Sequence, residues 1–215
     1  MAIALLVALS GTVRTQNPAP ADLAAALQKR YQTVRDFSAD FRHTNKGVLG
    51  RETIERGTLL VKKPGKMRWE YTSPEEKLFV SDGVTMYEYF VRDRQVIIRD
   101  VPANDDGSTP VLFLSGRGDL TRDFTPSFTE VDKDMPAGSR ALRLVPKTPQ
   151  GDYEALVLTV DGNTLALRGL TALDGQGGMS SFVFSNLREN INAADKQFQF
   201  TPPRGVEVVN ETSRR

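Results

Sequence analysis

The chain of 215 residues contains no cysteine. It therefore has no disulfide, no thiol nucleophile, no cysteine-ligated metal site and no cysteine that could carry a lipid anchor. Its single histidine, His43, excludes a metal site built from several histidines. A Ser-His-Asp arrangement would have to use this residue, which is predicted to lie in a polar loop after the first strand. The 28 basic and 27 acidic residues almost cancel, so no strong field attracts nucleic acid, and we expect no nucleic-acid partner.

Catalytic motifs are missing as well. The chain has no Gly-x-Ser-x-Gly elbow, and the glycines of Gly175–Gly178 have the wrong spacing for a phosphate-binding loop. The acidic pairs Glu75-Glu76 and Asp105-Asp106 fall in polar turns, where solvated charge is the ordinary interpretation. We therefore expect a protein that is not an enzyme and that uses no metal or cofactor.

A long apolar run occurs only at the start of the chain. The ten residues MAIALLVALS are too few to span a bilayer, but they have the length and composition of a secretory signal core. The alternative is an N-terminal strand or a disordered end, since no Lys or Arg precedes the run. We expect residues 1–20 to hold a leader and a Pro-rich start, residues 21–215 to form one domain, and the mature protein to be exported.

Hydrophobic periodicity predicts one helix followed mainly by strands. Apolar residues recur at helical spacing from Leu23 to Val34, with Asp22 placed as the N-cap. From Phe37 the period changes to two, which is typical of a half-buried strand. Further strand patterns occupy Gly57–Lys62, Met67–Thr72, Lys77–Val80, Val84–Val91, Gln95–Val101, Arg140–Val145, Tyr153–Val160, Thr164–Leu173 and Ser180–Leu187.

Asp-Gly pairs separate several of these strands. Asp82-Gly83, Asp161-Gly162 and Asp174-Gly175 favour hairpins, and a type I′ turn requires positive φ at both positions of the pair. No stretch between strands has the pattern of a crossover helix. The chain is therefore predicted to be mainly β (α+β), with an antiparallel sheet.

A short apolar helix is predicted within STPVLFLSGRGDL, residues 108–120. Thr109 can serve as its N-cap, and Gly116 fits the stop at its C-terminus. Its body is apolar on all sides: Val111, Leu112, Phe113 and Leu114. Such a helix must be covered, either as a core plug at one end of the β-domain or as a lid that shares a hydrophobic cavity with a ligand.

One face of the predicted sheet is rich in large apolar side chains. Met67, Trp69 and Tyr71 point to one side of their strand, and upstream Leu59, Val61 and Lys63 share one parity. A lysine in register with apolar residues is either an edge-strand lysine that opposes aggregation or an inward-pointing one. If Lys63 points inward, it needs a partner such as the carbonyl oxygens at the end of the short apolar helix.

Three motifs in order, RGTLLVKKPGKMRWEYTSPEEKLFVSDGVTMYEY, TPVLFLSGRGDL and FQFTPPRGVEV, resemble the LolA family of outer-membrane lipoprotein carriers from Leu23 to Val208. The resemblance implies an unclosed antiparallel β-barrel, or half-barrel, whose concave hydrophobic face is covered by helices. It also implies a periplasmic chaperone that receives acylated lipoproteins from an inner-membrane ABC transporter and delivers them to the outer-membrane acceptor LolB or an equivalent. We expect the carrier to be a monomer.

The resemblance also implies roles for residues. Trp69 falls on a tryptophan of the acyl-chain cavity wall, the segment Val111–Leu114 falls on the lid helix, and Lys63 falls where an arginine of the family latches the lid. Basic residues near the rim, Lys62, Lys66 and Arg68, are candidates for contact with membrane partners. The alternative function is a periplasmic domain of the same fold that senses lipoproteins or lipids without delivering them.

Overall fold

The computed structural model describes residues 18–101, 114–116 and 118–212. A helix, α1 (Pro20–Gln32), precedes β1 (Asp36–Lys46), β2 (Glu52–Lys62), β3 (Lys66–Ser73), β4 (Lys77–Asp82), β5 (Thr85–Phe90) and β6 (Gln95–Asp100). A one-turn helix, α3 (Leu120–Asp123), leads to β7 (Phe124–Thr129), β8 (Ser139–Pro146), β9 (Ala155–Asp161), β10 (Leu167–Leu173) and β11 (Met179–Glu189). The chain continues through the 3₁₀ turn η1 (Asp195–Phe198) to β12 (Glu207–Asn210). None of the helices in these ranges is long and apolar enough to cross a membrane.

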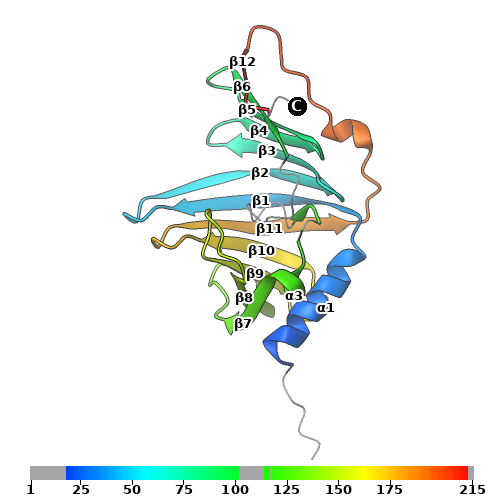
Figure 1. Cartoon of the computed structure of the whole chain (residues 1–215), viewed down its shortest axis with the longest axis vertical. Helices are drawn as coiled ribbons and strands as arrows, with labels where there is room; N and C mark the ends of the chain where they lie inside the picture. Colours follow the sequence, from blue (N-terminus) through cyan, green and yellow to red (C-terminus); the bar gives the residue numbers. More distant parts are fainter. Residues whose placement is uncertain (1–17, 102–113, 117, 213–215) are drawn as a thin grey trace, which may run out of the picture.

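All strands belong to one 12-stranded sheet in the order β12-β6-β5-β4-β3-β2-β1-β11-β10-β9-β8-β7. Strands β7 and β12 form its two edges, so the sheet does not close, and it is strongly curved and twisted (Figure 1). The prediction of an unclosed, mainly β fold with helices is confirmed. The long hairpin of β1 and β2 lies at the centre, where β11 returns to pair with β1.

Two edge strands were not predicted from the sequence. Strand β7 contains Pro126, which cannot donate to a ladder and is tolerated because β7 is an edge. Strand β12 pairs with β6 in parallel, through Glu207 opposite Gln95 to Asn210 opposite Ile98. This pair departs from the predicted antiparallel arrangement because the chain after β11 crosses from the middle of the sheet to its far edge (Figure 1).

Helix α1 begins earlier than predicted. Pro20 is its first residue and Ala19 is the N-cap, so Asp22 stands at the third helical position rather than at the cap. There its carboxylate accepts a hydrogen bond from the Ala19 backbone N–H at 3.0 Å. Proline has no backbone N–H, and Pro20 fits the first helical position because an N–H there would have no partner within the helix.

The Asp-Gly hairpins form, but not through type I′ turns. At Asp82-Gly83 only the glycine has a positive φ, of 99°, and the aspartate instead accepts hydrogen bonds from the backbone N–H groups of Val84 and Thr85, both at 2.8 Å. Asp161 and Asp174 hold the other two loops with their side chains in the same way. The aspartate side chain, rather than backbone φ alone, therefore shapes these turns.

Candidate functional site

A hydrophobic cluster fills the concave face of the sheet. It draws on α1, the central strands and the strands β8–β11. The five residues predicted to line an acyl-chain cavity all belong to it, with exposed fractions of 8% or less: Leu59, Val61, Met67, Trp69 and Tyr71. The strand parity that grouped them therefore corresponds to one buried face.

Aromatic rings form the centre of this face. We call Phe41 of β1, Trp69 and Tyr71 of β3, and Phe182 and Phe184 of β11 the aromatic wall. The Trp69 ring lies 5.2 Å from that of Phe41 and 5.0 Å from that of Phe182, between ring centroids. The arrangement is a continuous apolar surface built from three strands that are far apart in the sequence.

Gly57 in β2 makes this wall possible. It stands between Phe41 and Tyr71 in the sheet register, and the two rings approach to 4.8 Å over it. A Cβ atom at this position would lie 2.0 Å from the Glu70 carbonyl oxygen and 2.8 Å from the Phe41 ring. The absence of a side chain at Gly57 thus lets rings from two non-adjacent strands meet.

His43 lies at one end of the aromatic wall, inside β1 and not in a polar loop as the sequence had suggested. Its ring stacks on Phe182 at 3.9 Å between centroids. Its Nε2 lies 2.9 Å from the Ser180 hydroxyl, and its Nδ1 lies 3.2 Å from the Tyr71 hydroxyl. Burial lowers the pKa of His43 to about 4, against the opposing effect of nearby Glu55. The imidazole is therefore neutral at physiological pH.

Lys63 follows the end of β2, a central strand, so the edge-strand interpretation is wrong. Its ammonium group donates a hydrogen bond to the Tyr31 carbonyl near the C-terminus of α1 and lies over the Tyr31 ring, 3.2 Å from the centroid. The carbonyl it reaches is therefore on α1, and not one at the end of the short apolar segment. A cation at this position also interacts favourably with the negative end of the helix dipole.

The segment Leu114–Gly116 packs against this contact. The Tyr31 hydroxyl donates to the Leu114 carbonyl at 2.5 Å, and the Gly65 N–H donates to the Ser115 carbonyl at 3.0 Å. Gly116 has a φ of 81°, as expected for a helix stop, and a Cβ there would lie 2.8 Å from Cδ of Lys63. We call Tyr31, Lys63 and Leu114–Gly116 the closing contact.

Half-burial sets the protonation behaviour of the closing contact. Burial lowers the pKa of Lys63 to about 8, a decrease that Glu189 opposes and Arg30 adds to. Burial, with Glu189, raises the pKa of the Tyr31 hydroxyl. The Tyr31 hydroxyl therefore stays protonated and able to donate, while Lys63 begins to lose its proton at mildly alkaline pH.

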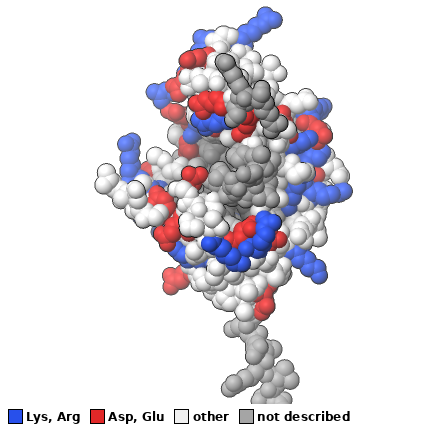
Figure 2. All heavy atoms as spheres, in the orientation of Figure 1, with Lys and Arg blue, Asp and Glu red and all other residues white. Residues whose placement is uncertain are grey.

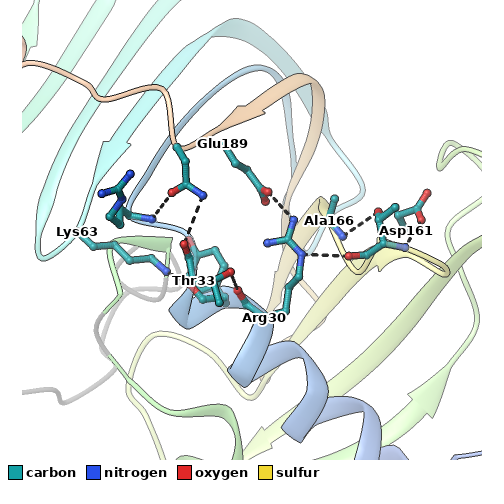
Figure 3. A network of polar contacts seen from close by, with 10 residues as sticks. Arg30, Thr33, Lys63, Asp161, Ala166 and Glu189 are labelled. Carbon is teal, nitrogen blue, oxygen red and sulfur yellow. Dashed lines mark hydrogen bonds and ion pairs between the residues drawn. The ribbon is translucent and has the colours of Figure 1, made fainter.

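Helix α1 is also bound to the β9–β11 half of the sheet (Figure 3). Arg30 forms an ion pair with Glu189 at the end of β11 and donates to the Thr164 carbonyl at 3.1 Å. Asn190 accepts from the Arg35 backbone N–H at 2.8 Å. One end of α1 is thus held by β11 and the β9–β10 loop, and Lys63 ties the same end to the β2–β3 side.

Most of the predicted lid lies outside the described residues, namely Val111, Leu112 and Phe113. Its last residue, Leu114, is fully buried in the hydrophobic cluster. Of the site residues, the three phenylalanines that β1 and β11 give to the aromatic wall were not predicted, and neither was Tyr31. Its helical spacing marked it as apolar-facing, but nothing in the sequence showed that its hydroxyl and carbonyl would join two other segments.

The three basic residues expected at the rim contact the chain itself. Lys62 donates to the Ala193 carbonyl at 2.8 Å and pairs with Asp195 at 2.7 Å, and Lys66 lies 3.1 Å from the same carboxylate. Arg68 pairs with Glu70 at 2.5 Å. On the face shown in Figure 2, charges of both signs are interspersed around the periphery. Across the described ranges, no group of three or more acidic or histidine side chains is placed to hold a metal.

Comparison with known proteins decides the family. Residues 32–201 match the family described as outer membrane lipoprotein carrier protein LolA. The chain belongs to the LolA family. It is 33% identical to the outer-membrane lipoprotein carrier protein of Methylococcus capsulatus, covering 86% of each chain, and 33% identical to that of Chromobacterium violaceum, covering 90% of each.

Solved structures are similar in fold alone. An uncharacterized conserved protein from Thermus thermophilus superposes with a TM-score of 0.52 at 14% identity, covering 87% of this chain and 99% of that one. MucB superposes with a TM-score of 0.50 at 14% identity, covering 88% of this chain and 65% of MucB. The LolA-family assignment therefore depends on the sequence matches, and the structures agree with it in architecture.

Proposed function

We propose that this protein is a periplasmic lipoprotein chaperone that buries acyl chains against its concave face and carries them to the outer membrane. The observation that carries the proposal is the continuous apolar face of an unclosed sheet, centred on the aromatic wall. The relatives named outer-membrane lipoprotein carrier proteins support the same function. They do not favour the alternative of a sensing domain that never delivers its ligand.

The physical need for such a carrier is large. Burying an acyl chain is worth about 0.8 kcal/mol per CH₂ group, so the tens of methylenes on one lipoprotein amount to tens of kcal/mol. A carrier must supply this burial and then give the cargo up. It can do so if, in the empty protein, its own side chains occupy the surface that the acyl chains cover, because the net affinity is then the difference between two buried states.

We infer that the closing contact controls this exchange. Lys63 is the latch, holding α1 to the β2–β3 side, and Tyr31 joins α1 to the segment that ends the lid. Opening requires these hydrogen bonds to break, so their strength adds to the free energy that the cargo must overcome. The cavity-lining roles of Leu59, Val61, Met67, Trp69 and Tyr71, and the lid role of Val111–Leu114, belong to the same proposal.

Partners and location follow from the same function. We propose that residues 1–20 contain the export leader, that an inner-membrane ABC transporter supplies the cargo, and that a LolB-type acceptor removes it. The carrier acts as a monomer in this scheme.

Site-specific photo-crosslinking tests the proposal. Benzoylphenylalanine replaces Phe184, which is 5% exposed on the aromatic wall, or Phe128, which is 47% exposed on β7. Each protein is incubated with ATP and vesicles that hold the transporter and an acylated lipoprotein. We expect a water-soluble complex from both variants, a crosslink to the acyl chains from position 184 only, and cargo transfer to acceptor-bearing membranes.

Other outcomes would separate the possibilities. Capture without transfer would favour the sensing alternative. Crosslinks from position 128 and none from position 184 would place the cargo elsewhere on the molecule. Failure of every protein, including the unmodified chain, to release lipoprotein from the vesicles would refute the carrier function.

A further inference from the structure

Trp69 carries an unpaired polar group in the middle of the concave face. The side chain is 4% exposed, and its Nε1 is the one buried side-chain nitrogen or oxygen among the described residues that has no hydrogen-bond partner. A buried indole N–H usually finds an acceptor, and leaving it without one is costly. This donor therefore calls for a physical explanation.

Unlike the Trp69 N–H, the other buried polar groups next to the aromatic wall have hydrogen-bond partners. The Tyr71 hydroxyl and both ring nitrogens of His43 lie within hydrogen-bond distance of a partner, through His43, Tyr71 and Ser180. Buried polar groups at the edge of the aromatic wall are thus satisfied inside the protein. The Trp69 ring is surrounded by the rings of Phe41, Phe182 and Phe184, whose side chains carry no oxygen or nitrogen acceptor.

A ligand that enters this apolar face can supply the missing acceptor. An alkyl chain has no acceptor, so hydrocarbon burial alone leaves the N–H unpaired. An acyl chain differs from an alkyl chain by one carbonyl group at its head, where the ester or amide linkage is formed. That carbonyl oxygen is the acceptor that acylated cargo brings to the concave face.

We propose that Trp69 is a specificity residue that donates its indole N–H to the linkage carbonyl of a bound acyl chain. The inference rests on the proposed function and assigns to one residue of the concave face the recognition of the carbonyl that links each acyl chain. A site with a buried donor discriminates against an analogue that lacks the acceptor, because the donor stays unpaired in that complex. Trp69 thus recognises the linkage carbonyl by a hydrogen bond, while the surrounding rings bury the hydrocarbon chain.

Paired probes test this on the unmodified protein. Dioctanoylglycerol carries two ester carbonyls, and its dioctyl ether analogue has the same chain length but only ether oxygens, which are weaker acceptors, in their place. Because the chain has a single tryptophan, a ¹⁵N-labelled sample gives one indole N–H signal, which reports the state of Trp69 directly. We expect the ester to bind about 2- to 10-fold more tightly than the ether, as one hydrogen bond allows. We also expect that only the ester shifts the indole proton signal downfield. The shift caused by the ether measures the ring-current effect of filling the site, and it is subtracted.

Two variants complete the experiment. Trp69→Phe keeps an aromatic ring but removes the donor, so the two probes should bind it equally. Phe184→Leu reduces the same wall without removing a donor, so it should weaken both probes and keep the preference for the ester.

Equal binding of both probes to the unmodified chain, with the indole signal unmoved by the ester, would overturn the inference and leave the carrier function standing. Binding of neither probe would count against acyl-chain burial itself, and the inference would fall with it.

Discussion

Lys63 makes the stability of this protein depend on pH in a way that can be calculated. Its pKa is about 8 in the folded protein, against 10.5 for an ordinary lysine, because its burial disfavours the charged form. Between these two values the unfolded chain binds more protons than the folded one. Stability therefore rises with pH through this window, and the positive charge opposes folding below it.

The expected size follows from the two pKa values. For a fully shielded group with these two pKa values, raising the pH from 7 to 9 increases the free energy of unfolding by about 1.3 kcal/mol. Because the side chain is only half-buried, solvent screening reduces the rise to about 1 kcal/mol in the free energy of unfolding. Tyr31, which faces Lys63, does not interfere, since an unfolded tyrosine titrates near pH 10.

Urea unfolding monitored by circular dichroism at pH 7, 8 and 9 measures this rise. The matched control is Lys63→Arg, whose guanidinium stays charged over the whole range and should show no such increase. A wild-type free energy of unfolding that stays flat from pH 7 to 9, or an equal rise in Lys63→Arg, would refute the assignment of the effect to this ammonium group.

Three further predictions concern other parts of the site. Gly57→Ala should destabilise the protein by more than about 3 kcal/mol, because its Cβ would overlap the Glu70 carbonyl oxygen; a loss below about 1 kcal/mol in urea unfolding would contradict this. Lowering the pH from 7 to 5 should cost about 2 kcal/mol of unfolding free energy through His43, whose pKa is lowered to about 4, and His43→Gln should lose this dependence in thermal scans. Tyr31→Phe should lower the free energy of unfolding by about 1 kcal/mol, because it deletes the hydrogen bond to the Leu114 carbonyl. The variant should also bind acylated cargo up to about 5-fold more tightly, and an unchanged affinity would show that this hydrogen bond does not oppose opening.

Local patterns in the sequence predicted much of this architecture. A period of two in MRWEY places Met67, Trp69 and Tyr71 on one side of a strand, and the structure buries all three in one cluster. The change from helical to strand spacing near Phe37 and the turns at Asp-Gly pairs depend on neighbouring residues alone, so they can be read without the fold. Three ordered motifs were enough to indicate the LolA family, which the comparisons show.

Only the tertiary structure decided which distant segments meet. The partner of Lys63 is the Tyr31 carbonyl, 32 residues away, and no local pattern specifies a backbone carbonyl as acceptor. His43 looked like a loop residue because its neighbours are polar, yet β11 and β3 bury it against Phe182 and Tyr71. Strand β12 pairs with β6 at the far edge of the sheet, after a long connection from β11. That connection has no helical or strand periodicity, so the sequence did not predict where β12 would pair. Periodicity records which way a side chain points along its own strand, whereas its contacts are set by pairing and packing between segments far apart in the chain.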